Sequence, residues 1–397
     1  MNPHKSHTGQ SMSDNASKNK VNSRKITVRP VETQGDLKLF YKVPFEIYKD
    51  IPQWVPPFWF EFKEFFDKRN PFWKHAKYRM FLVYSDHILC GRIAAVIDDL
   101  YCKTYREKTG FFGFFECIDD FSCAEELFTQ AEKWLASNEM DTMMGPIDGR
   151  IDVGCGFLYN GFDDYTTLLS TYNPEYYISF CKQYNLKKCR DFYEYYIDLQ
   201  RPLPLDLVKK AQQCSKSGIN VRAFKRFRTN HELKWWISLF LETFDKHWGY
   251  VPVSENEVRS RFGVKQLRWT VDPGLFLIAE KDGKPIAYLW GTPEFNQVFR
   301  TMNGKLGLTG YVRFFIDKKT VDIGKLHLIG IKENLRHHNI GSYLNYLALL
   351  EMQKRGYKAA IIGSIDEHNK NAHDTIKITG ARIYKKFRVF EKQINSS

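Results

Sequence analysis

The amino-acid sequence predicts an α/β protein of the α+β kind, built from two tandem copies of one unit. Apolar, strand-like runs alternate with periodic, helix-like segments from residue 26 onward. The order of these elements repeats, because FLVYSDHILCGRIAAVID at 81–98 corresponds to FLIAEKDGKPIAYLWGTP at 276–293. Both copies also contain Gly-x-Ile-Asp, at 145–148 and at 363–366. Such matches in the same order indicate a duplication.

Length and composition favour a protein of two domains without a membrane span. The chain has 397 residues, of which 43% are hydrophobic, and this is enough for two cores. No stretch approaches the roughly 18 apolar residues that are needed to cross a bilayer. Residues 1–25 are rich in Ser, Asn, Lys and His and lack an apolar stretch, which predicts a disordered tail and not a signal peptide.

Cysteine usage and net charge restrict the location and the partners. All eight cysteines lie between Cys90 and Cys214, without a C-x-x-C pair or zinc-ligand spacing, which predicts reduced thiols, a cytoplasmic protein and no metal. The net charge of +13 favours anionic partners. Nucleic acid is the least favoured of these, because no recognition motif is present. Peripheral contact with the anionic inner face of the membrane stays open as an alternative.

The first copy is predicted to occupy residues 26–200. Its expected strands are 26–28, 79–84, 92–97, 111–117, 142–147 and 191–199, and its expected helices are 36–49, 122–137 and 176–184. The proline- and aromatic-rich stretch at 51–59 is either a loop that seals the core or a wall of an acyl or lipid groove. An insertion rich in Gly, Asp and aromatic residues, 149–172, is expected to shape a cleft shared by the two copies.

The second copy is predicted to follow a linker. The sequence Arg201-Pro-Leu-Pro-Leu interrupts the pattern, and residues 201–218 are assigned to this linker. The second copy, 219–397, then has expected strands at 220–224, 275–280, 285–291 and 326–331 and expected helices at 232–247 and 343–355.

A polar turn at 336–342 leads from the strand at 326–331 directly into a helix. The first amides of a helix have no internal acceptor and lie at the positive end of its dipole, so they bind phosphate groups readily. Gly341 has no Cβ, so its backbone can approach a ligand closely or adopt the αL conformation. The turn therefore predicts a site for a phosphate or pyrophosphate.

The run from Arg336 to Gly341 resembles the CoA-binding motif of the GNAT acyltransferase superfamily, in which Arg/Gln-x-x-Gly-x-Gly/Ala follows a strand and opens a helix. Asn339 replaces the first glycine, and Asn also visits αL. The resemblance implies two tandem GNAT-like lobes, each a mixed, mostly antiparallel twisted sheet flanked by helices. It also implies a CoA thioester, either acetyl-CoA or a long-chain acyl-CoA, as co-substrate. The implied cofactor-binding residues are Ile329, Ile331, Arg336, His337, His338, Asn339, Ile340, Gly341, Ser342 and Asn369, the last within a matching Asn-x-x-Ala.

The first copy differs at the corresponding turn. It has Cys117-Ile-Asp-Asp-Phe-Ser-Cys123 there, and two carboxylates at a helix start complement the dipole internally and repel a pyrophosphate. Residues 26–200 are therefore predicted to form a degenerate lobe without a CoA loop, and residues 219–397 to form the lobe that binds CoA.

Acyl transfer to an amine requires a base that takes the amine proton and donors that stabilise the developing oxyanion. His327 is a candidate base, because a period of two places it on the same face of its strand as Ile329 and Ile331. Glu367, just past the next strand, is a second candidate. For both residues, a purely structural role is the alternative: an imidazole satisfied in the sheet, and a solvated loop carboxylate.

Two further candidates come from the resemblance. His247 lies in a segment that corresponds to the acceptor-binding loop of the superfamily. The superfamily often has a tyrosine seven residues after the motif asparagine as general acid toward the CoA thiolate, and this chain has Ile376 there. Tyr384 is the nearest replacement, with packing in the core as the alternative.

Nearly the whole chain after Arg29 also resembles a narrower group, the tandem-GNAT bacterial proteins that include ceramide-synthase-type N-acyltransferases. The matching segments are Trp54-Val-Pro-Pro, Asn70-Pro-Phe, Gly91-Arg-Ile-Ala, Thr109-Gly-Phe-Phe-Gly-Phe-Phe-Glu116, Asn173-Pro-x-Tyr-Tyr177 and Trp248-Gly-Tyr-Val-Pro252. The group implies transfer of an acyl chain from a CoA thioester to a primary amine, such as a long-chain sphingoid amine. Acetylation of a small soluble amine, and CoA binding without catalysis, are the alternatives.

Overall fold

The computed structural model describes residues 24–262 and 271–394. They form a mixed α/β fold around one continuous 13-stranded sheet with the strand order β1-β2-β3-β4-β5-β13-β7-β12-β11-β10-β9-β8, and β6 pairs with β13 beside this path. All pairings are antiparallel except β4 with β5 and β11 with β12. The predicted fold class, mostly antiparallel sheets flanked by helices, is confirmed.

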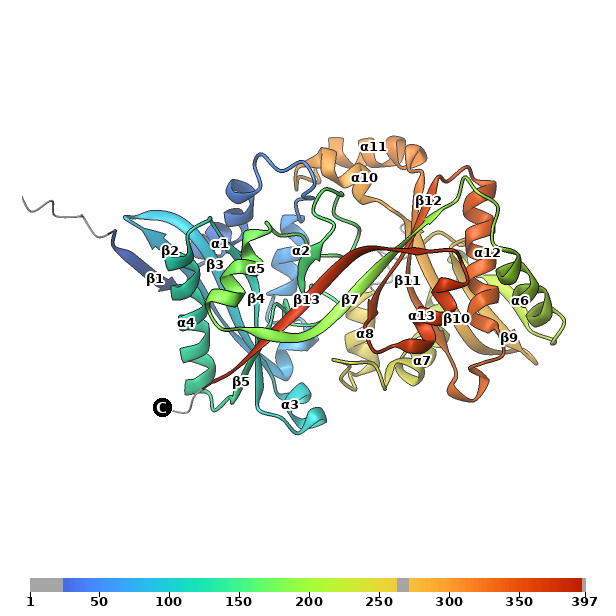
Figure 1. Cartoon of the computed structure of the whole chain (residues 1–397), viewed down its shortest axis with the longest axis horizontal. Helices are drawn as coiled ribbons and strands as arrows, with labels where there is room; N and C mark the ends of the chain where they lie inside the picture. The colour runs from blue at the N-terminus through green and yellow to red at the C-terminus, as the bar shows by residue number, and fades with distance from the viewer. Residues whose placement is uncertain (1–23, 263–270, 395–397) are drawn as a thin grey trace, which may run out of the picture.

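The first lobe contains the elements up to β7 (Figure 1). Its strands are β1 (Ile26–Pro30), β2 (Ala76–Ser85), β3 (Ile88–Asp98), β4 (Thr109–Cys117), β5 (Thr142–Gly145), β6 (Phe157–Asn160) and β7 (Lys187–Asp198). Its helices are α1 (Gln34–Ile47), α2 (Trp59–Phe65), the 3-10 turn η1 (Pro71–Lys74), α3 (Asp99–Tyr105), α4 (Phe121–Ser137) and α5 (Tyr176–Gln183).

The second lobe repeats this order. Its strands are β8 (Asn220–Ala223), β9 (Phe276–Lys281), β10 (Lys284–Pro293), β11 (Ile323–Ile331), β12 (Ala359–Asp366) and β13 (Arg382–Gln393). Its helices are α6 (Leu205–Ser215), α7 (Thr229–Phe244), α8 (Glu255–Arg261), α10 (Asn296–Phe299), α11 (Leu308–Asp317), α12 (Ile340–Lys354) and α13 (Lys370–Lys377), with 3-10 turns η2 (Arg226–Arg228), η3 (Arg300–Met302), η4 (Lys318–Thr320) and η5 (Glu333–Leu335).

The last strand of each lobe pairs with a strand of the other lobe. β7 of the first lobe pairs with β12, and β13 of the second lobe pairs with β5. The two exchanged strands also pair with each other, from Arg382↔Tyr196 to Glu391↔Lys187. They run side by side through the middle of the molecule and join its two halves into one sheet (Figure 1). Because backbone hydrogen bonds of both lobes depend on this exchange, we expect the lobes to unfold together.

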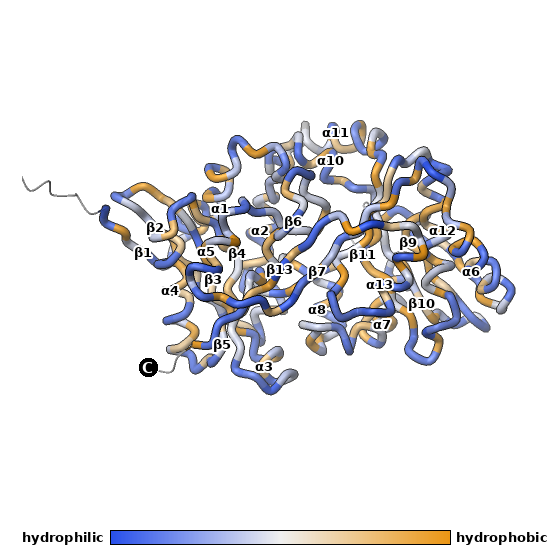
Figure 2. Tube along the Cα trace, in the orientation of Figure 1, coloured by the Kyte–Doolittle hydropathy of each residue, from blue (hydrophilic) through white to orange (hydrophobic). Residues whose placement is uncertain are grey.

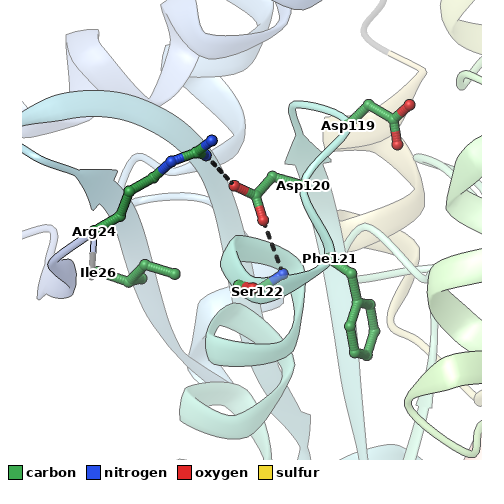
Figure 3. A pocket seen from close by; sticks show the side chains of 6 residues that line it. All are labelled: Arg24, Ile26, Asp119, Asp120, Phe121 and Ser122. Atoms are coloured by element: carbon green, nitrogen blue, oxygen red, sulfur yellow. Dashed lines mark hydrogen bonds and ion pairs between the residues drawn. The ribbon is translucent and has the colours of Figure 1, made fainter. Parts of the chain in front are cut away.

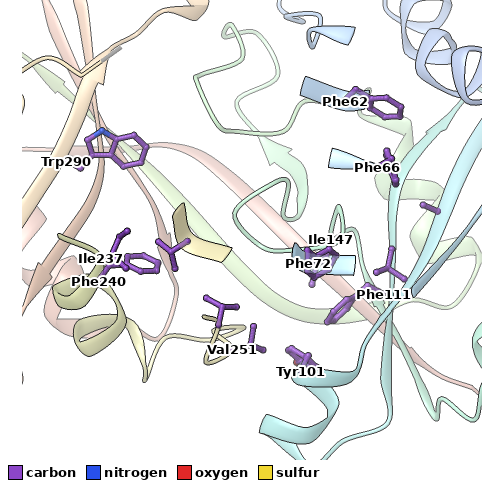
Figure 4. Packing of buried hydrophobic residues seen from close by; sticks show 14 of the residues in the cluster. Phe62, Phe66, Phe72, Tyr101, Phe111, Ile147, Ile237, Phe240, Val251 and Trp290 are labelled. Carbon is purple, nitrogen blue, oxygen red and sulfur yellow. The ribbon is translucent and has the colours of Figure 1, made fainter. Parts of the chain in front are cut away.

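Apolar side chains form separate cores on the two faces of the sheet. One cluster lies under α4 and α5, and another lies under α12 and α13. The largest cluster is shared, because it contains Phe62 and Phe72 from the first lobe and Trp236 and Trp290 from the second. Figure 4 shows members of this shared cluster on elements from both lobes. Hydrophobic and hydrophilic residues alternate along the helices that cover the sheet (Figure 2), as expected for amphipathic helices.

The stretch predicted to be a linker, 201–218, contains helix α6. Pro204 is the N-cap of this helix, and Leu207, Ala211 and Cys214 are buried. The run of prolines interrupts the first lobe as expected, but prolines are also compatible with a helix start, because the first amides of a helix need no partner within it. Residues 201–218 therefore include part of the packed second lobe.

The insertion at 149–172 lies at the junction of the lobes. The amide of Leu168 donates to the Glu294 carboxylate at 2.9 Å, and the side-chain amide of Asn296 donates to the carbonyl of Thr166 at 3.0 Å.

Within the described residues, no helix combines the length and the apolar character that crossing a membrane requires.

Candidate active site

In the second lobe, the neighbouring strands β11 and β12 separate partway along their length. They pair in parallel from Ile323↔Ala359 to Leu326↔Ile362. β11 continues to Ile331 along β10, whereas β12 continues to Asp366 along β7. Beyond Leu326, the edge of β11 that faces β12 therefore lies outside this ladder. Backbone amides and carbonyls on such an edge can pair with an extended ligand that carries amide groups.

A β-bulge in β11 begins at the same point. Trp290 and Gly291 of β10 lie opposite Leu328 and Leu326, so that His327 is the extra residue. A bulge turns the side chains that follow it to the other face of the sheet. The parting of the strands and the bulge together define an opening beside the carboxyl end of β11.

The turn after β11 leads into the N-terminus of α12 at this opening. Asn339 is the N-cap residue, with φ of 58°, and its side chain makes no capping hydrogen bond. His337 also has a positive φ, 74°. Both are thus in the left-handed region, which Asn and His tolerate better than most residues. The helix start has no side-chain cap, so its first amides and the positive end of its dipole are available for an anion.

Gly341 lies within the first turn of α12 and has no positive φ, so αL freedom is not its role. A Cβ at this position would lie 3.3 Å from Thr375 Cγ2 of α13 and 3.4 Å from Ile331 Cδ1. Glycine therefore allows α12, α13 and β11 to approach one another closely. Ile340 and Ser342 beside it are buried.

The other residues of the predicted cofactor site differ in their contacts. Arg336 donates weakly to two carbonyls, that of Ile331 at 3.4 Å and that of Thr243 at 3.5 Å. His337 and His338 are exposed. Asn369 uses its side-chain oxygen to cap α13, accepting from the amide of Ala372 at 3.2 Å.

The corresponding place in the first lobe is already occupied by the protein's own groups. Asp120 caps α4 by accepting from the amide of Ser122 at 3.0 Å, and Arg24 pairs with the same carboxylate at 3.1 Å (Figure 3). The hydroxyl of Tyr177 accepts from the amide of Cys117 at 2.7 Å, at the end of β4. The capped helix start and the satisfied strand end leave no equivalent anion site there.

Buried aromatic rings also fill the first lobe beside β4. Phe115, Phe157 and Tyr177 lie with ring centroids between 5.0 and 5.8 Å apart, and all three are buried. Edge-to-face packing of this kind stabilises an apolar core. The two lobes have therefore diverged at equivalent positions.

His327 lies at the bulge, but not on the predicted face. Its ring packs at a tilt against Trp290 of the shared cluster, with centroids 4.7 Å apart, and its Nε2 is 2.8 Å from Thr292 Oγ1. Ile329 and Ile331 pack instead against the core under α12. The prediction of a common face is wrong, because a period of two does not hold across a bulge. Burial, and secondarily the charge of Lys325, holds the pKa of His327 well below its usual value, so the ring is neutral.

His247 follows α7 and is also held neutral. Burial lowers its pKa, and the charge of Arg336 lowers it further. The ring stacks on Phe244 at 4.2 Å, and its Nδ1 is buried without a hydrogen-bond partner. Arg336, from the turn before α12, reaches the carbonyl of Thr243 near the end of α7 at 3.5 Å. A neutral imidazole with an unpaired nitrogen can accept a proton.

Glu367 forms an ion pair with the first lobe. Its carboxylate accepts from Lys188 Nζ at 2.6 Å and from the amide of Asp191 at 3.0 Å. Burial alone would raise the pKa of Glu367, but these hydrogen bonds outweigh it and lower the pKa. A carboxylate with a lowered pKa is a weak base.

Tyr384 lies on β13 at the lobe junction. Its ring packs 5.7 Å from that of Tyr196, and burial, with the charge of Asp164, raises its pKa. Among the residues that the structure describes, no hydrogen bond or ion pair joins any two of His247, His327, Glu367 and Tyr384. The structure therefore distributes the four predicted catalytic residues over separate environments.

A histidine and a tyrosine that contact each other beside the opening were not predicted from the sequence. His373 of α13 contacts the Tyr195 hydroxyl through Nδ1, at 2.5 Å, and the carbonyl of Asp366 through Nε2, at 3.0 Å. The duplication contains a signal for it, since His373 follows Asn369 by the same four residues that separate Tyr177 from Asn173. Ile376, at the position of the missing acid, is buried in the core under α12.

A buried ion pair also lies close to the bulge. Lys325 Nζ donates to Glu194 Oε1 at 2.7 Å, and their side chains are 1% and 0% exposed. The same ammonium reaches the Ser170 hydroxyl at 2.7 Å and the carbonyl of Leu168 at 2.6 Å in the insertion.

In the part of the chain that the structure describes, no cluster of three or more His, Cys, Asp or Glu side chains is arranged to hold a metal ion.

The chain is similar to known proteins over most of its length. The model of the acetyltransferase (GNAT) family matches residues 236–380, which include β11, the turn and α12. Protein YghO of Escherichia coli is 27% identical over 92% of this chain and 95% of its own length. A protein named bacterial ceramide synthase, from Caulobacter vibrioides, is 26% identical over 93% of this chain and 98% of its own length.

A solved structure shares the two-lobed fold. A tandem GNAT protein from the clavulanic acid biosynthesis pathway superposes with a TM-score of 0.56 at 12% identity, covering 94% of this chain and all of that one. The match to the acetyltransferase (GNAT) family thus covers most of the second lobe and none of the first. The chain as a whole has the two-lobed fold of a tandem GNAT protein. It is similar over nearly its full length to the Caulobacter protein named as a ceramide synthase.

Proposed function

We propose that this protein is an acyl-CoA-dependent N-acyltransferase whose second lobe alone binds CoA. The observation that carries the proposal is the contrast between two equivalent helix starts. The start of α12 has no side-chain cap and lies where β11 and β12 separate, whereas Asp120 caps α4. The pyrophosphate of CoA would bind the first amides of α12 near Arg336, and its pantetheine arm, which carries two amides, would extend along the edge of β11.

In the reaction, the amine nitrogen attacks the thioester carbonyl, the carbon–sulfur bond breaks, and a proton passes from the amine to a base. His247 suits the role of base best, because it is neutral and its Nδ1 has no partner. His327 is the second candidate, although Thr292 already contacts its Nε2. The lowered pKa of Glu367, in which hydrogen bonds from Lys188 outweigh the effect of burial, makes it the weakest of the three.

The leaving thiolate requires a proton donor or a positive field. Tyr384 was the residue predicted for this role, and the contact between His373 and the Tyr195 hydroxyl provides a second possibility on α13. The position of His373 supports this second possibility, because its helix packs closely on the start of α12. Thr375 of that helix lies so near Gly341 that a Cβ there would be in contact with it. These two residues extend the set of candidate groups beyond those that the sequence indicates.

The acceptor that we propose is a primary amine on a long-chain lipid. Homology to the Caulobacter protein named as a ceramide synthase supports this choice, and so does a net charge of +13, which favours anionic membrane surfaces. Acetylation of a small soluble amine is the alternative that the experiment must exclude.

Activity of the purified full chain tests the proposal. We expect release of free CoA thiol, and an amide product by mass spectrometry, with long-chain acyl-CoA and a sphingoid-type base. Parallel reactions contain acetyl-CoA with a polyamine, and each acyl-CoA without amine. Efficient transfer from acetyl-CoA to the polyamine alone would overturn the lipid assignment, and CoA binding without any amide product would overturn the catalytic one.

A further inference from the structure

Helix α11 presents an apolar face to solvent. Tyr311, Val312, Phe315 and Ile316 are 51%, 56%, 43% and 64% exposed, and we call these four residues the α11 face. Residues spaced by one and four positions lie on one side of a helix. Among the side chains of α11 that the structure describes, Phe314, on the opposite side, packs inward, against the small cluster that contains Val298 and Met302. Four large apolar side chains on one short helix are a contiguous patch, and such patches mark interaction sites.

Basic residues surround this face. Lys318 Nζ lies 4.5 Å above the ring of Phe315, Lys319 is exposed on the following 3-10 turn, and Lys305 is exposed before the helix. Arg313 is exposed, and its Nε forms an ion pair with Asp317 Oδ2 at 3.1 Å. Two copies of this chain that met through the α11 face would bring these cations together, so charge disfavours self-association and favours an anionic partner.

A row of packed aromatic rings connects α11 to the exposed ring of Phe60. Phe314 packs on Phe299, which packs on Phe58, which in turn stacks on Phe60, with centroids 5.7, 5.2 and 5.7 Å apart. Phe60 is 44% exposed. In Figure 1, α11 and α10 lie together along one edge of the molecule, above the exchanged strands. These ring contacts therefore join α11 of the second lobe to Phe58 and Phe60 of the first.

We propose that α11 docks the protein on an anionic lipid bilayer. The helix would lie in the plane of the membrane interface, with the α11 face among the acyl chains and Lys305, Lys318 and Lys319 at the lipid phosphates. Hydrophobic side chains supply the burial, and the cations supply the preference for anionic lipids. Docking does not depend on catalysis, although a lipid acceptor as proposed above would be drawn from the same surface.

Vesicle flotation with the purified full chain tests the docking. The probes are vesicles of phosphatidylcholine alone and of phosphatidylcholine mixed equally with phosphatidylglycerol. We expect binding to the mixed vesicles that falls with salt, and at least tenfold weaker partitioning for the double variant Val312→Asp/Ile316→Asp. Ile88→Asp is the control, because Ile88, at the start of β3 in the first lobe, is 70% exposed and its replacement should leave partitioning unchanged.

Three outcomes would overturn the docking: no binding of the wild type to mixed vesicles, equal binding of the α11 variant, or a dimer in solution that the α11 variant abolishes. Acyl transfer measured in detergent micelles, where docking is not needed, separates the two proposals. Transfer in micelles without vesicle binding removes only the docking, whereas vesicle binding without transfer removes only the enzyme assignment.

Discussion

Replacement of Lys325 by methionine should strongly destabilise the protein. Lys325 and Glu194 form an ion pair that is nearly inaccessible to solvent. Burial would raise the pKa of Glu194, but the charge and hydrogen bond of Lys325 outweigh it and lower the pKa. Methionine has a similar length and removes the charge, so that a buried carboxylate loses its cation. Breaking one partner of a buried pair costs about 3–5 kcal/mol, out of a total of roughly 5–15 kcal/mol for a folded domain.

Urea unfolding followed by circular dichroism measures this loss. Lys332→Met is the matched control, because Lys332 directly follows β11 and pairs with Glu242 at 2.9 Å in a partly exposed position. An exposed pair contributes about 0–1 kcal/mol. The double variant Lys325→Met/Glu194→Leu should be more stable than Lys325→Met alone, since it leaves no unpaired charge.

Two results would refute this reasoning. One is a loss of less than about 1 kcal/mol for Lys325→Met, which would place the pair in a solvated environment. The other is a double variant whose loss equals the sum of the two single losses, because independent sites add whereas paired charges do not.

Three further predictions concern the cofactor, the base and pH. Asn339→Asp should weaken CoA binding about tenfold or more by calorimetry, because a carboxylate would cap α12, whereas Asp120→Asn in the first lobe should have no effect. His247→Ala should lower turnover more than CoA affinity and remove the acidic limb of the pH–rate profile, so an unchanged profile would locate the base elsewhere. A hydrogen bond to Asp98 raises the pKa of His75 to about 9, so this contact contributes its full stability below about pH 6.5 and loses it as the pH rises through 9. Wild-type protein should therefore lose on the order of 2 kcal/mol more than His75→Gln between these limits, and parallel losses would contradict the assignment.

The sequence by itself determined the features that depend on neighbouring residues. The polar turn before α12, the two aspartates before α4 and the repeated order of strands and helices follow from local composition and period. The repeated order also predicted two tandem units, and the resemblance of the turn at 336–341 to the GNAT motif implied the fold of each unit. Helix α11 was not predicted, since four of its apolar residues face solvent and its pattern does not correspond to a buried stripe.

Only the tertiary structure decided the features that depend on residues far apart in the chain. The exchange of β7 and β13 between lobes rests on pairings such as Ile362↔Tyr195, which no local pattern specifies. The bulge at His327 places the histidine ring against Trp290. One extra residue in a strand moves all the side chains that follow it to the opposite face of the sheet. The partner of Glu367, Lys188, comes from the other lobe. The pKa of a side chain, and whether its polar atoms have hydrogen-bond partners, depend on residues of this kind. The fold brings these residues together, and the neighbouring sequence does not specify them.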